Sequence, residues 1–407
     1  GTQLYLFGGV TNETLGPLGM LVIRLLKTLA TPLVFLAILD AFLQCDISFR
    51  HGGRLLAICG VNLLVAMLIG LTIMNIFTPG ESWSGQIHEL TAQLLGEASK
   101  ISVKSAPAGI TLNPLKNISG YIPENIVEPF FKNNVISVIL LALLMGSALR
   151  YLQQHPFAGD NAGVELLAKL INAGYQLLLR MLAWVILAIP YAITGVVAQV
   201  VGKSGLSVFI LLSIFLATML AGLLLHCFVY YPCMVRWVGK MPVKRYLGQG
   251  MDAIVMGFST NSSLATVPVT LRCLTENLGI SQRSARLSAL IGTNLNNDGI
   301  ILYEAMAAIF MAQAMGFNLE LSQQLMIVAA SVMVGVGVSG IPEAGLIALP
   351  LVLSSIGLPE QLIVMLIPLI ATVDWIIARV RSVVNVMSDI LVAILLERLE
   401  SPTNSEA

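Results

Sequence analysis

The chain has 407 residues, of which 57% are hydrophobic and only 11% are charged. Soluble domains carry about 25% charged residues, so this composition excludes an ordinary soluble enzyme and a disordered protein. Basic and acidic residues balance at 22 each, which argues against a polyanionic partner such as nucleic acid. The apolar runs far exceed the ~10-residue alternating segments of a transmembrane barrel. The composition therefore predicts an all-α polytopic membrane protein.

Five apolar runs are long enough to cross a bilayer as helices, because a helical span needs about 20 residues. They are residues 17–44, 53–78, 134–153, 164–201 and 204–235. One long polar connection, residues 81–132, separates the second run from the third and is expected on the outer side. Three shorter loops contain clusters of basic residues and are expected in the cytoplasm. These residues are Arg50 and Arg54, then Arg236, Lys240, Lys244 and Arg245, then Arg272, Arg283 and Arg286.

The last 160 residues follow a different pattern. Residues 246–275 and 323–356 each contain two short apolar pieces, broken by FSTNSSLATVP (258–268) and by GVGVSGIPEAG (335–345). A full-length segment follows each pair: 286–316, interrupted by NLNNDG (294–299), and 358–396, containing RVRSVVN (379–385). We therefore expect a broken hairpin and an interrupted span, twice over. Paired interrupted segments of this kind indicate the binding site of a transporter.

Ionisable residues are concentrated at or near membrane depth in these four elements. Each costs about 2.5–3.5 kcal/mol at a helix centre unless it is paired or hydrated. Their enrichment points to an ion or substrate path, although a buried Arg–Asp pair can also serve only to hold helices together. The seven residues are Asp298, Glu304, Glu343, Asp374, Arg379, Arg381 and Asp389.

One stripe of the segment 358–396 carries most of this chemistry. At about 100° per residue, Asp374, Arg381, Asn385 and Asp389 share one helix face, and Ala378 completes that face. Arg379 points about 160° away from Arg381 by the same arithmetic, so the two arginines need different partners. The planar fork of Arg381 suits a carboxylate.

Oxygen ligands for a cation are offered by the NLNNDG interruption. Asn296, Asp298 and the broken backbone around Gly299 provide the amide, carboxylate and carbonyl oxygens that a hard cation prefers. Two rival classes remain open. Asp298 and Asp389 could belong to an intramembrane protease, although the flanking motifs of such enzymes are absent. An anion channel or a non-transporting sensor is the other rival.

The sequence resembles the dicarboxylate/amino acid:cation symporter family, which includes the animal excitatory amino-acid transporters and the archaeal aspartate transporters. The resemblance covers about 17–398 and rests on five strings in matching order and spacing. They are TNSSLATVPVT (260–270), NNDG (296–299), LYEAMAAIFMAQ (302–313), GIPEAGL (340–346) and VDWIIARVRSVVNVMSD (373–389).

The resemblance implies a glutamate-transporter-homologue fold with two re-entrant helical hairpins and inverted repeats. It implies a homotrimer in a plasma or bacterial inner membrane, an elevator mechanism with the second hairpin as gate, and a first span preceding residue 1. The implied division assigns 1–52 to a scaffold, 53–80 to a transport domain, 81–203 to an extracellular loop and scaffold spans, 204–398 to the transport domain, and 399–407 to a cytoplasmic tail.

Site residues can be carried over from the family position by position. Substrate contacts are implied for Arg381, Asn385, Ser262, Ser263, Ala378, Ile300, Val338, Gly340 and Ser382. A sodium site is implied at Gly292, Asn296, Asn385 and Asp389, with Asp298 remaining from a further cation site. Glu304 matches a proton-carrying glutamate, and Arg379 matches a second arginine. No cofactor is expected beyond Na⁺ or H⁺ as coupling ions, and no enzymatic activity is expected.

The departures from the family pattern shape the substrate hypothesis. Ala378 replaces the aspartate that binds the amino group, Asn297 and Ile300 replace the family's Met and Thr, and Glu343 replaces a small or amide residue. A buried ammonium without a partner costs several kcal/mol. The leading hypothesis is therefore a C4-dicarboxylate without an α-amino group. The alternatives are a sodium- or proton-coupled glutamate/aspartate symporter, with Glu343 or Asp374 receiving the amine, and an anion channel or non-transporting homologue.

Overall fold

The computed structural model describes residues 5–6, 10–44, 49–84, 122–131, 135–155, 162–204, 208–337, 343–355, 358 and 360–400. In these ranges the chain is helical apart from turns and one antiparallel pair of two-residue strands, β1 (Tyr5–Leu6) and β2 (Val10–Thr11). The predicted all-α class is therefore confirmed for this part of the chain.

The first half of the chain forms long apolar helices close to the predicted spans. They are α1 (Asn12–Gln44), α2 (Phe49–Phe77), α6 (Val135–Gln154), α7 (Ala162–Ser204) and α8 (Val208–Leu225). A π-helical turn, η5 (His226–Tyr230), continues α8 into α9 (Tyr231–Trp237). The polar connection contributes a 3₁₀ turn, η2 (Pro79–Trp83), and the short helix α5 (Glu128–Phe131); most of its other residues lie outside the described ranges.

Four helical stretches among the described residues are long and apolar enough to cross a membrane: Gly52–Phe77, Ser137–Gln154, Ala162–Tyr191 and Phe209–Trp237. Many large apolar side chains on these helices face outward, as Leu64, Leu144 and Leu187 do with exposed fractions of 66%, 69% and 71%. Such a surface is unfavourable in water and suits lipid. The chain is a multi-pass membrane protein.

The second half consists of shorter elements. They are α10 (Val243–Thr260), α11 (Ser263–Arg272), η6 (Cys273–Asn277), α12 (Gln282–Arg286), η7 (Leu287–Gly292), α13 (Thr293–Leu295), α14 (Asp298–Ala314), α15 (Leu321–Gly337), α16 (Ala344–Ser355) and α17 (Glu360–Glu400). We refer to α10 with α11 as the first helix pair and to α15 with α16 as the second helix pair.

The breaks in these elements differ in part from expectation. In the first helix pair only Asn261 and Ser262 leave the helix, so the break is shorter than the predicted 258–268. The predicted interruption within 294–299 is confirmed, since Asn296 and Asn297 separate α13 from α14. The turn of the second helix pair, including Val338 and Gly340, falls on residues outside the described ranges.

The interruption expected in 358–396 is wrong. Helix α17 runs unbroken from Glu360 to Glu400, and RVRSVVN (379–385) lies in its middle. That stretch contains neither Gly nor Pro, and its buried polar side chains Arg381 and Asn385 find partners inside the bundle. The backbone therefore has no steric or hydrogen-bonding reason to open there.

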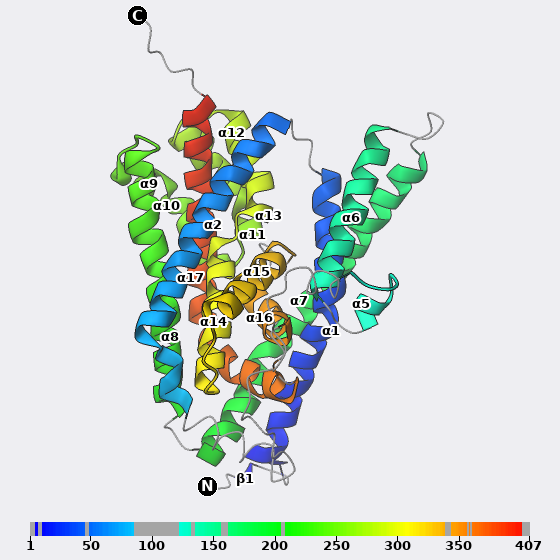
Figure 1. Ribbon diagram of the computed structural model, residues 1–407, viewed down its shortest axis with the longest axis vertical. Helices are drawn as coiled ribbons and strands as arrows, with labels where there is room; N and C mark the ends of the chain where they lie inside the picture. Colours follow the sequence, from blue (N-terminus) through cyan, green and yellow to red (C-terminus); the bar gives the residue numbers. More distant parts are fainter. Residues whose placement is uncertain are drawn as a thin grey trace, which may run out of the picture.

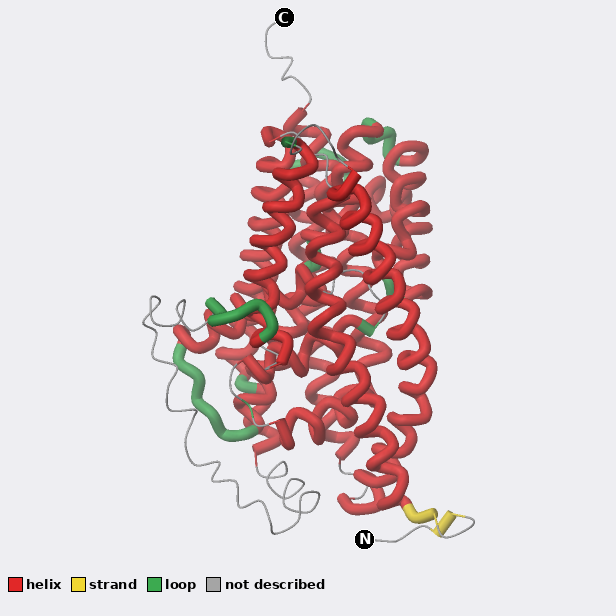
Figure 2. The backbone as a smooth tube through the Cα atoms, turned by 90° about the vertical axis from the view of Figure 1, so that its right-hand side faces the viewer, coloured by secondary structure: helices red, strands yellow, loops and turns green. Residues whose placement is uncertain are grey.

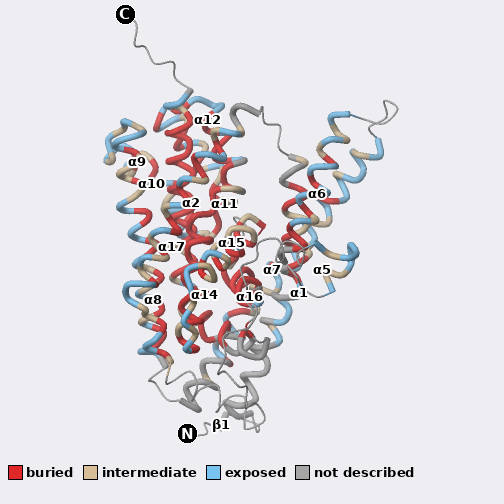
Figure 3. Tube along the Cα trace, viewed as in Figure 1, coloured by how far each residue is buried: buried red, intermediate tan, exposed pale blue. Residues whose placement is uncertain are grey.

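Helix α14 lies at the centre of the molecule. It packs against α2, α8, α15, α16 and α17, and nearly every one of its residues is buried (Figures 1 and 3). Helices α1, α6 and α7 pack mainly on one another, and in Figure 1 α6 leans away from the central helices. In the orthogonal view most long helices run along the long axis of the molecule (Figure 2). The described residues Ser262, Ile300 and Ala344, at the starts of α11, α14 and α16, lie around one cavity.

Candidate functional site

Two left-handed residues place helix starts beside the middle of α17. Asn261, with φ of 52°, turns the chain out of α10, and Ser262 then caps α11 by accepting the backbone N–H of Ala265 at 3.1 Å. Glu343, with φ of 57°, precedes α16. Asparagine tolerates this conformation, whereas a glutamate in it is uncommon. Each turn delivers the N-terminus of a helix to the interior.

These helix starts share one small cavity with α14 and α17. Most of the predicted substrate-contact residues that the structure describes therefore line a single site. The lining residues are Asn261, Ser262, Ser263, Ile300, Ala344, Ala378, Arg381, Ser382 and Asn385.

Arg381 is fixed at this cavity by three groups. Its Nη1 and Nη2 atoms donate to Oδ1 and Oδ2 of Asp374 at 3.2 and 3.1 Å, and the guanidinium lies 4.1 Å from the ring centroid of Tyr303. The guanidinium also packs directly against the backbone of Gly345, one residue into α16. Arg381 is only 3% exposed and Asp374 is fully buried. The arginine is thus oriented before any ligand arrives.

Arg379 lies in a different environment from Arg381, as its position on the helix predicts. Its Nη1 donates to the Trp375 carbonyl at 2.7 Å, and the guanidinium lies 5.6 Å from the exposed Trp375 ring. Arg379 does not line the cavity. The two arginines therefore have separate partners.

The cavity wall combines apolar and polar side chains. Ala378 and Ile300 give it an apolar patch. Both ends of the Asn385 amide have partners within the protein. Its Oδ1 accepts the Gly299 N–H at 2.9 Å, and its Nδ2 donates to Asn297 Oδ1 at 3.3 Å. The hydroxyls of Ser263 and Ser382 are buried with no hydrogen-bond partner in the described protein. The wall thus offers a cation, neutral hydroxyls and methyl groups.

Glu304 lies one residue beyond the aromatic ring that supports Arg381. Its side chain is fully buried, and neither of its carboxylate oxygens has a hydrogen-bond partner among the described residues. The hydroxyl of Tyr303 is also unpartnered and buried. An isolated carboxylate in such surroundings is strongly disfavoured, so this position suits a group that takes up a proton or meets a cation.

Glu343 joins the two helix pairs instead of lining the cavity. Its Oε1 accepts the Asn261 Nδ2–H at 2.9 Å, which connects the turn before α16 to the turn before α11. Both residues are the left-handed ones of their turns. The bridge therefore links the residues that precede both helix starts, and one of them, Asn261, also lines the cavity.

Of the residues predicted to bind sodium, Asn385 and Asp389 lie one and two turns beyond Arg381 on α17, Gly292 ends η7, and Asn296 lies between α13 and α14. Asp389 Oδ2 accepts the Thr293 hydroxyl at 2.6 Å, and its Oδ1 accepts the Asn296 amide at 3.5 Å. The backbone N–H of Asn296 donates to Gly292 O at 2.6 Å. The side-chain oxygen of Asn296 is buried without a partner. The Asp389 carboxylate and the unpartnered oxygen of the neighbouring Asn296 amide are donor types that a hard cation prefers.

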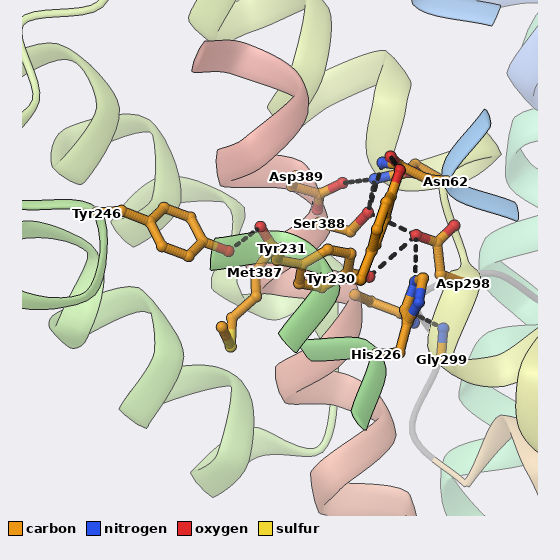
Figure 4. A network of polar contacts seen from close by, with 12 residues as sticks. Asn62, His226, Tyr230, Tyr231, Tyr246, Asp298, Gly299, Met387, Ser388 and Asp389 are labelled. Atoms are coloured by element: carbon orange, nitrogen blue, oxygen red, sulfur yellow. Dashed lines mark hydrogen bonds and ion pairs between the residues drawn. The ribbon is translucent and has the colours of Figure 1, made fainter. Parts of the chain in front are cut away.

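Asp298 has a different environment, shown in Figure 4. Its Oδ2 accepts the Tyr231 hydroxyl at 2.9 Å and the Ser388 hydroxyl at 2.8 Å, and lies 3.3 Å from His226 Nε2. Protein donors from η5, α9 and α17 therefore surround this carboxylate oxygen.

Further polar side chains contact Ser388. Asn62 of α2 donates to the Ser388 hydroxyl at 3.3 Å and accepts the Tyr230 hydroxyl at 2.8 Å, and Asn296 donates to the same serine at 2.7 Å. Our sequence reasoning missed His226, Tyr230 and Tyr231. Their signal is HCFVYYPC (226–233), a cluster of polar aromatic residues within an otherwise apolar span.

The chain matches a known protein family. The family model described as the sodium:dicarboxylate symporter family matches residues 2–399. The chain belongs to the sodium:dicarboxylate symporter family. Members of this family are transporters, and membership makes the chain a cation-coupled transporter.

Its relatives in this symporter family include animal proteins. The putative sodium-dependent excitatory amino acid transporter glt-4 of Caenorhabditis elegans is 24% identical over 94% of this chain and 82% of its own length. Excitatory amino acid transporter 1 of Ambystoma tigrinum is 28% identical over 94% of this chain and 76% of its own. Its counterpart in Rattus norvegicus is 37% identical over 46% of this chain and 34% of its own.

Proposed function

We propose that the chain is a cation symporter for a small carboxylate, best represented by a C4-dicarboxylate without an α-amino group. One observation carries the proposal: Arg381 and the starts of α11 and α16 share one small cavity in which residue 378 is an alanine. The positive groups favour carboxylates, and the alanine removes the partner that an ammonium group needs.

Carboxylate recognition follows from the charges on the cavity wall. Asp374 uses one N–H of each Nη atom of Arg381, which leaves Nε–H and the second Nη hydrogens for a ligand. Helix N-termini carry about half a positive charge and unsatisfied N–H groups, and α11 and α16 both begin at the cavity. A C4-dicarboxylate, whose two carboxylates are separated by two carbon atoms, can use the arginine and a helix start together.

The cavity wall should reject an ammonium group because no carboxylate on it is available to pair with the positive charge. A buried ammonium requires a nearby carboxylate, and Ala378 provides only a methyl group. Asp374 is occupied by Arg381, and Glu343 accepts from Asn261. These two acids were the candidates for receiving an amine, and both have partners within the protein.

Coupling to sodium fits the groups around Asp389. The Asp389 carboxylate, the unpartnered Asn296 oxygen and the helix break at Asn296 and Asn297 gather oxygen donors next to the cavity. Asn385 lines the cavity and also holds Gly299 and Asn297 at the start of α14. Because one asparagine belongs to both regions, occupation of either is expected to order the other. A proton carried by Glu304 is the second coupling route that we propose.

The family resemblance supplies the architecture of the proposal. Both helix pairs are re-entrant hairpins, and the two halves of the transport domain form inverted repeats. Residues 1–52 and the spans within 81–203 form a scaffold, and residues 53–80 and 204–398 form a transport domain that moves as an elevator. Three copies assemble through the scaffold. The first helix pair and the second helix pair enclose the substrate.

An amino-acid symporter is the second candidate function. The printed names of the relatives are those of excitatory amino acid transporters. Glu343 lies beside the substrate region, and a small rotation of its carboxylate away from Asn261 would let it meet an ammonium group. An anion channel or a non-transporting homologue is a third candidate, because several coupling residues are altered.

The deciding experiment is uptake of labelled succinate and labelled L-aspartate into proteoliposomes with an inward sodium gradient and no pH gradient. Succinate accumulation alone supports the proposal. Ala378→Asp is the matched variant, since it returns a carboxylate to the wall, and it should gain aspartate uptake at the expense of succinate. Aspartate uptake by the unmodified protein without competition from succinate would establish the second candidate. Current without accumulation would establish the channel.

A further inference from the structure

The hydroxyl of Ser388 uses its full hydrogen-bonding capacity. This residue of α17 is completely buried. Its hydroxyl donates to Asp298 Oδ2 at 2.8 Å, and it accepts an N–H from Asn296 at 2.7 Å and another from Asn62 at 3.3 Å. The contacts with Asp298 and Asn62 can be followed in Figure 4. A serine hydroxyl has one proton to donate and two lone pairs that accept, so these three side chains satisfy it completely.

Asp298 sets the direction of the Ser388 hydroxyl. An ionised carboxylate only accepts hydrogen bonds, so the serine proton must point toward Asp298 Oδ2. The Tyr231 hydroxyl donates to the same oxygen at 2.9 Å, and His226 Nε2 lies 3.3 Å from it. Protein groups therefore surround this oxygen, and a cation would have to displace them to bind there.

The direction of the Ser388 hydroxyl in turn fixes the orientation of the Asn296 amide. Because the serine proton points to Asp298, only a lone pair faces Asn296, and only the Nδ2 end of the amide can meet it. Nδ2 also lies 3.5 Å from Asp389 Oδ1, to which it donates. The amide oxygen is left buried without a partner in the described protein. The serine thus determines which end of the amide remains available.

Asn62 provides a comparison within the same network. It also donates from Nδ2 to Ser388, but its Oδ1 accepts the Tyr230 hydroxyl at 2.8 Å. Ser388 therefore orients two amides, and of these two only Asn296 has an unpartnered oxygen. A buried amide oxygen without a partner is unfavourable unless a ligand satisfies it. Its position beside the Asp389 carboxylate indicates that the ligand is a cation.

We infer that Ser388 is a positioning residue for sodium binding, and that Asp298 acts on the cation through Ser388 instead of coordinating it. The inference rests on the sodium coupling proposed at Asp389 and deepens it. Asp298 holds the serine proton, Ser388 holds the Asn296 amide, and the amide presents its oxygen beside Asp389. Without the hydroxyl the amide is free to rotate and to turn an N–H group, which cannot bind a cation, toward the site.

The test is a sodium titration of the thermal stability of the detergent-solubilised full chain, without substrate and with choline chloride keeping the ionic strength constant. Ser388→Ala should raise the half-saturating sodium concentration about tenfold or more, because the site loses a fixed oxygen ligand. Ser331→Ala is the matched control and should leave the titration unchanged. Ser331 is a buried serine of α15 whose hydroxyl donates to the Ile327 carbonyl of its own helix.

A double-mutant cycle separates positioning from direct coordination. Asp298→Asn should weaken sodium binding by itself, because asparagine can donate to Ser388 and so reverse the direction of the hydroxyl. In the Ser388→Ala background the same substitution should change the half-saturating concentration by less than about twofold, since residues that act through one another are not additive. If Asp298 were an independent cation ligand, the two losses would multiply.

An unchanged half-saturating sodium concentration in Ser388→Ala would overturn the inference and leave the proposed sodium coupling intact. Losses that multiply in the cycle would also overturn it, because Asp298 would then act on the cation without Ser388. If the stability of the unmodified protein does not respond to sodium, the proposed coupling fails and the inference fails with it. Should Ser388→Ala not fold, Ser388→Cys takes its place, since a thiol is a weak hydrogen-bonding group and the same increase is expected.

Discussion

Arg381 and Asp374 lie two turns apart on α17 and face each other through two hydrogen bonds of 3.2 and 3.1 Å. Both side chains are almost completely buried. The pair neutralises the arginine without using all of its N–H groups, so the guanidinium is held in place and still presents donors to the cavity. Asp374, on the same helix, therefore contributes to the orientation of the guanidinium at the cavity.

Replacement of Asp374 by asparagine should destabilise the protein strongly. It leaves a buried guanidinium without a counter-charge, for which the usual loss is about 3–5 kcal/mol. The measurement is thermal or denaturant unfolding of the detergent-solubilised chain. The matched control is Asp252→Asn, because Asp252 pairs with Arg272 at 3.2 Å on the exposed surface, where such pairs contribute about 0–1 kcal/mol. Equal effects of the two substitutions would contradict the role given to the buried pair.

Replacement of Gly345 by alanine should impair substrate binding. A Cβ atom at this position overlaps the Arg381 guanidinium, so either the arginine or α16 must shift. Because Arg381 is fixed by Asp374 and Tyr303, we expect the half-saturating substrate concentration to rise about tenfold or more, given the strength of hydrogen bonds to charged groups. Gly248→Ala in α10 is the control, since its added Cβ meets no atom within 4 Å. Unchanged affinity in Gly345→Ala would show that the guanidinium moves freely.

Replacement of Glu304 by glutamine should flatten the pH dependence of uptake. Glutamine preserves the shape of the side chain but cannot take up or release a proton. Both carboxylate oxygens lack partners in the described protein, so the substitution breaks no hydrogen bond there. Initial uptake rates across a range of external pH values provide the measurement, with the exposed Glu320→Gln as control. A pH profile identical to that of the unmodified protein would argue against proton carriage by Glu304.

Loss of the Glu343–Asn261 bridge should accelerate release of bound substrate. Glu343→Ala removes the acceptor that links the two turns, whereas Glu343→Gln keeps an oxygen that can accept from Asn261. We expect roughly 3- to 10-fold faster dissociation for the alanine variant and little change for the glutamine variant. Asn261→Gly removes the donor and keeps the left-handed backbone, so it should reproduce the alanine variant.

The same pair of variants separates the two candidate functions. If Glu343 received an ammonium group, Glu343→Gln would abolish aspartate uptake as completely as Glu343→Ala does, because the charge would be what matters. Under the dicarboxylate proposal the glutamine variant behaves like the unmodified protein. Dissociation of labelled aspartate and of labelled succinate from the purified protein measures how each substitution changes the binding of either compound.

Local patterns in the sequence were sufficient for much of the fold. The apolar runs predict α1, α2, α6 and α7 to within several residues at their ends, and the run 204–235 covers α8, η5 and most of α9, because a span depends on the hydropathy of contiguous residues. The sequence also predicts the NLNNDG interruption, which depends on local backbone propensity. It predicts the different surroundings of Arg379 and Arg381 as well, which depend on helix geometry alone. The break predicted at RVRSVVN is wrong, because polar residues within a helix do not unwind it when their side chains find partners in the bundle.

The partners of the buried polar residues were decided only by the tertiary structure. His226 and Tyr231 reach Asp298 across 72 and 67 residues, and Asn62 reaches Ser388 across 326. The approach of Gly345 to Arg381 and the unpartnered hydroxyls of Ser263 and Ser382 likewise depend on how separate helices pack. Sequence periodicity assigns a residue to one face of its own helix. Which group meets that face is determined by the packing of distant segments, and in this protein that packing is what gives the cavity its charge and its hydrogen-bonding groups.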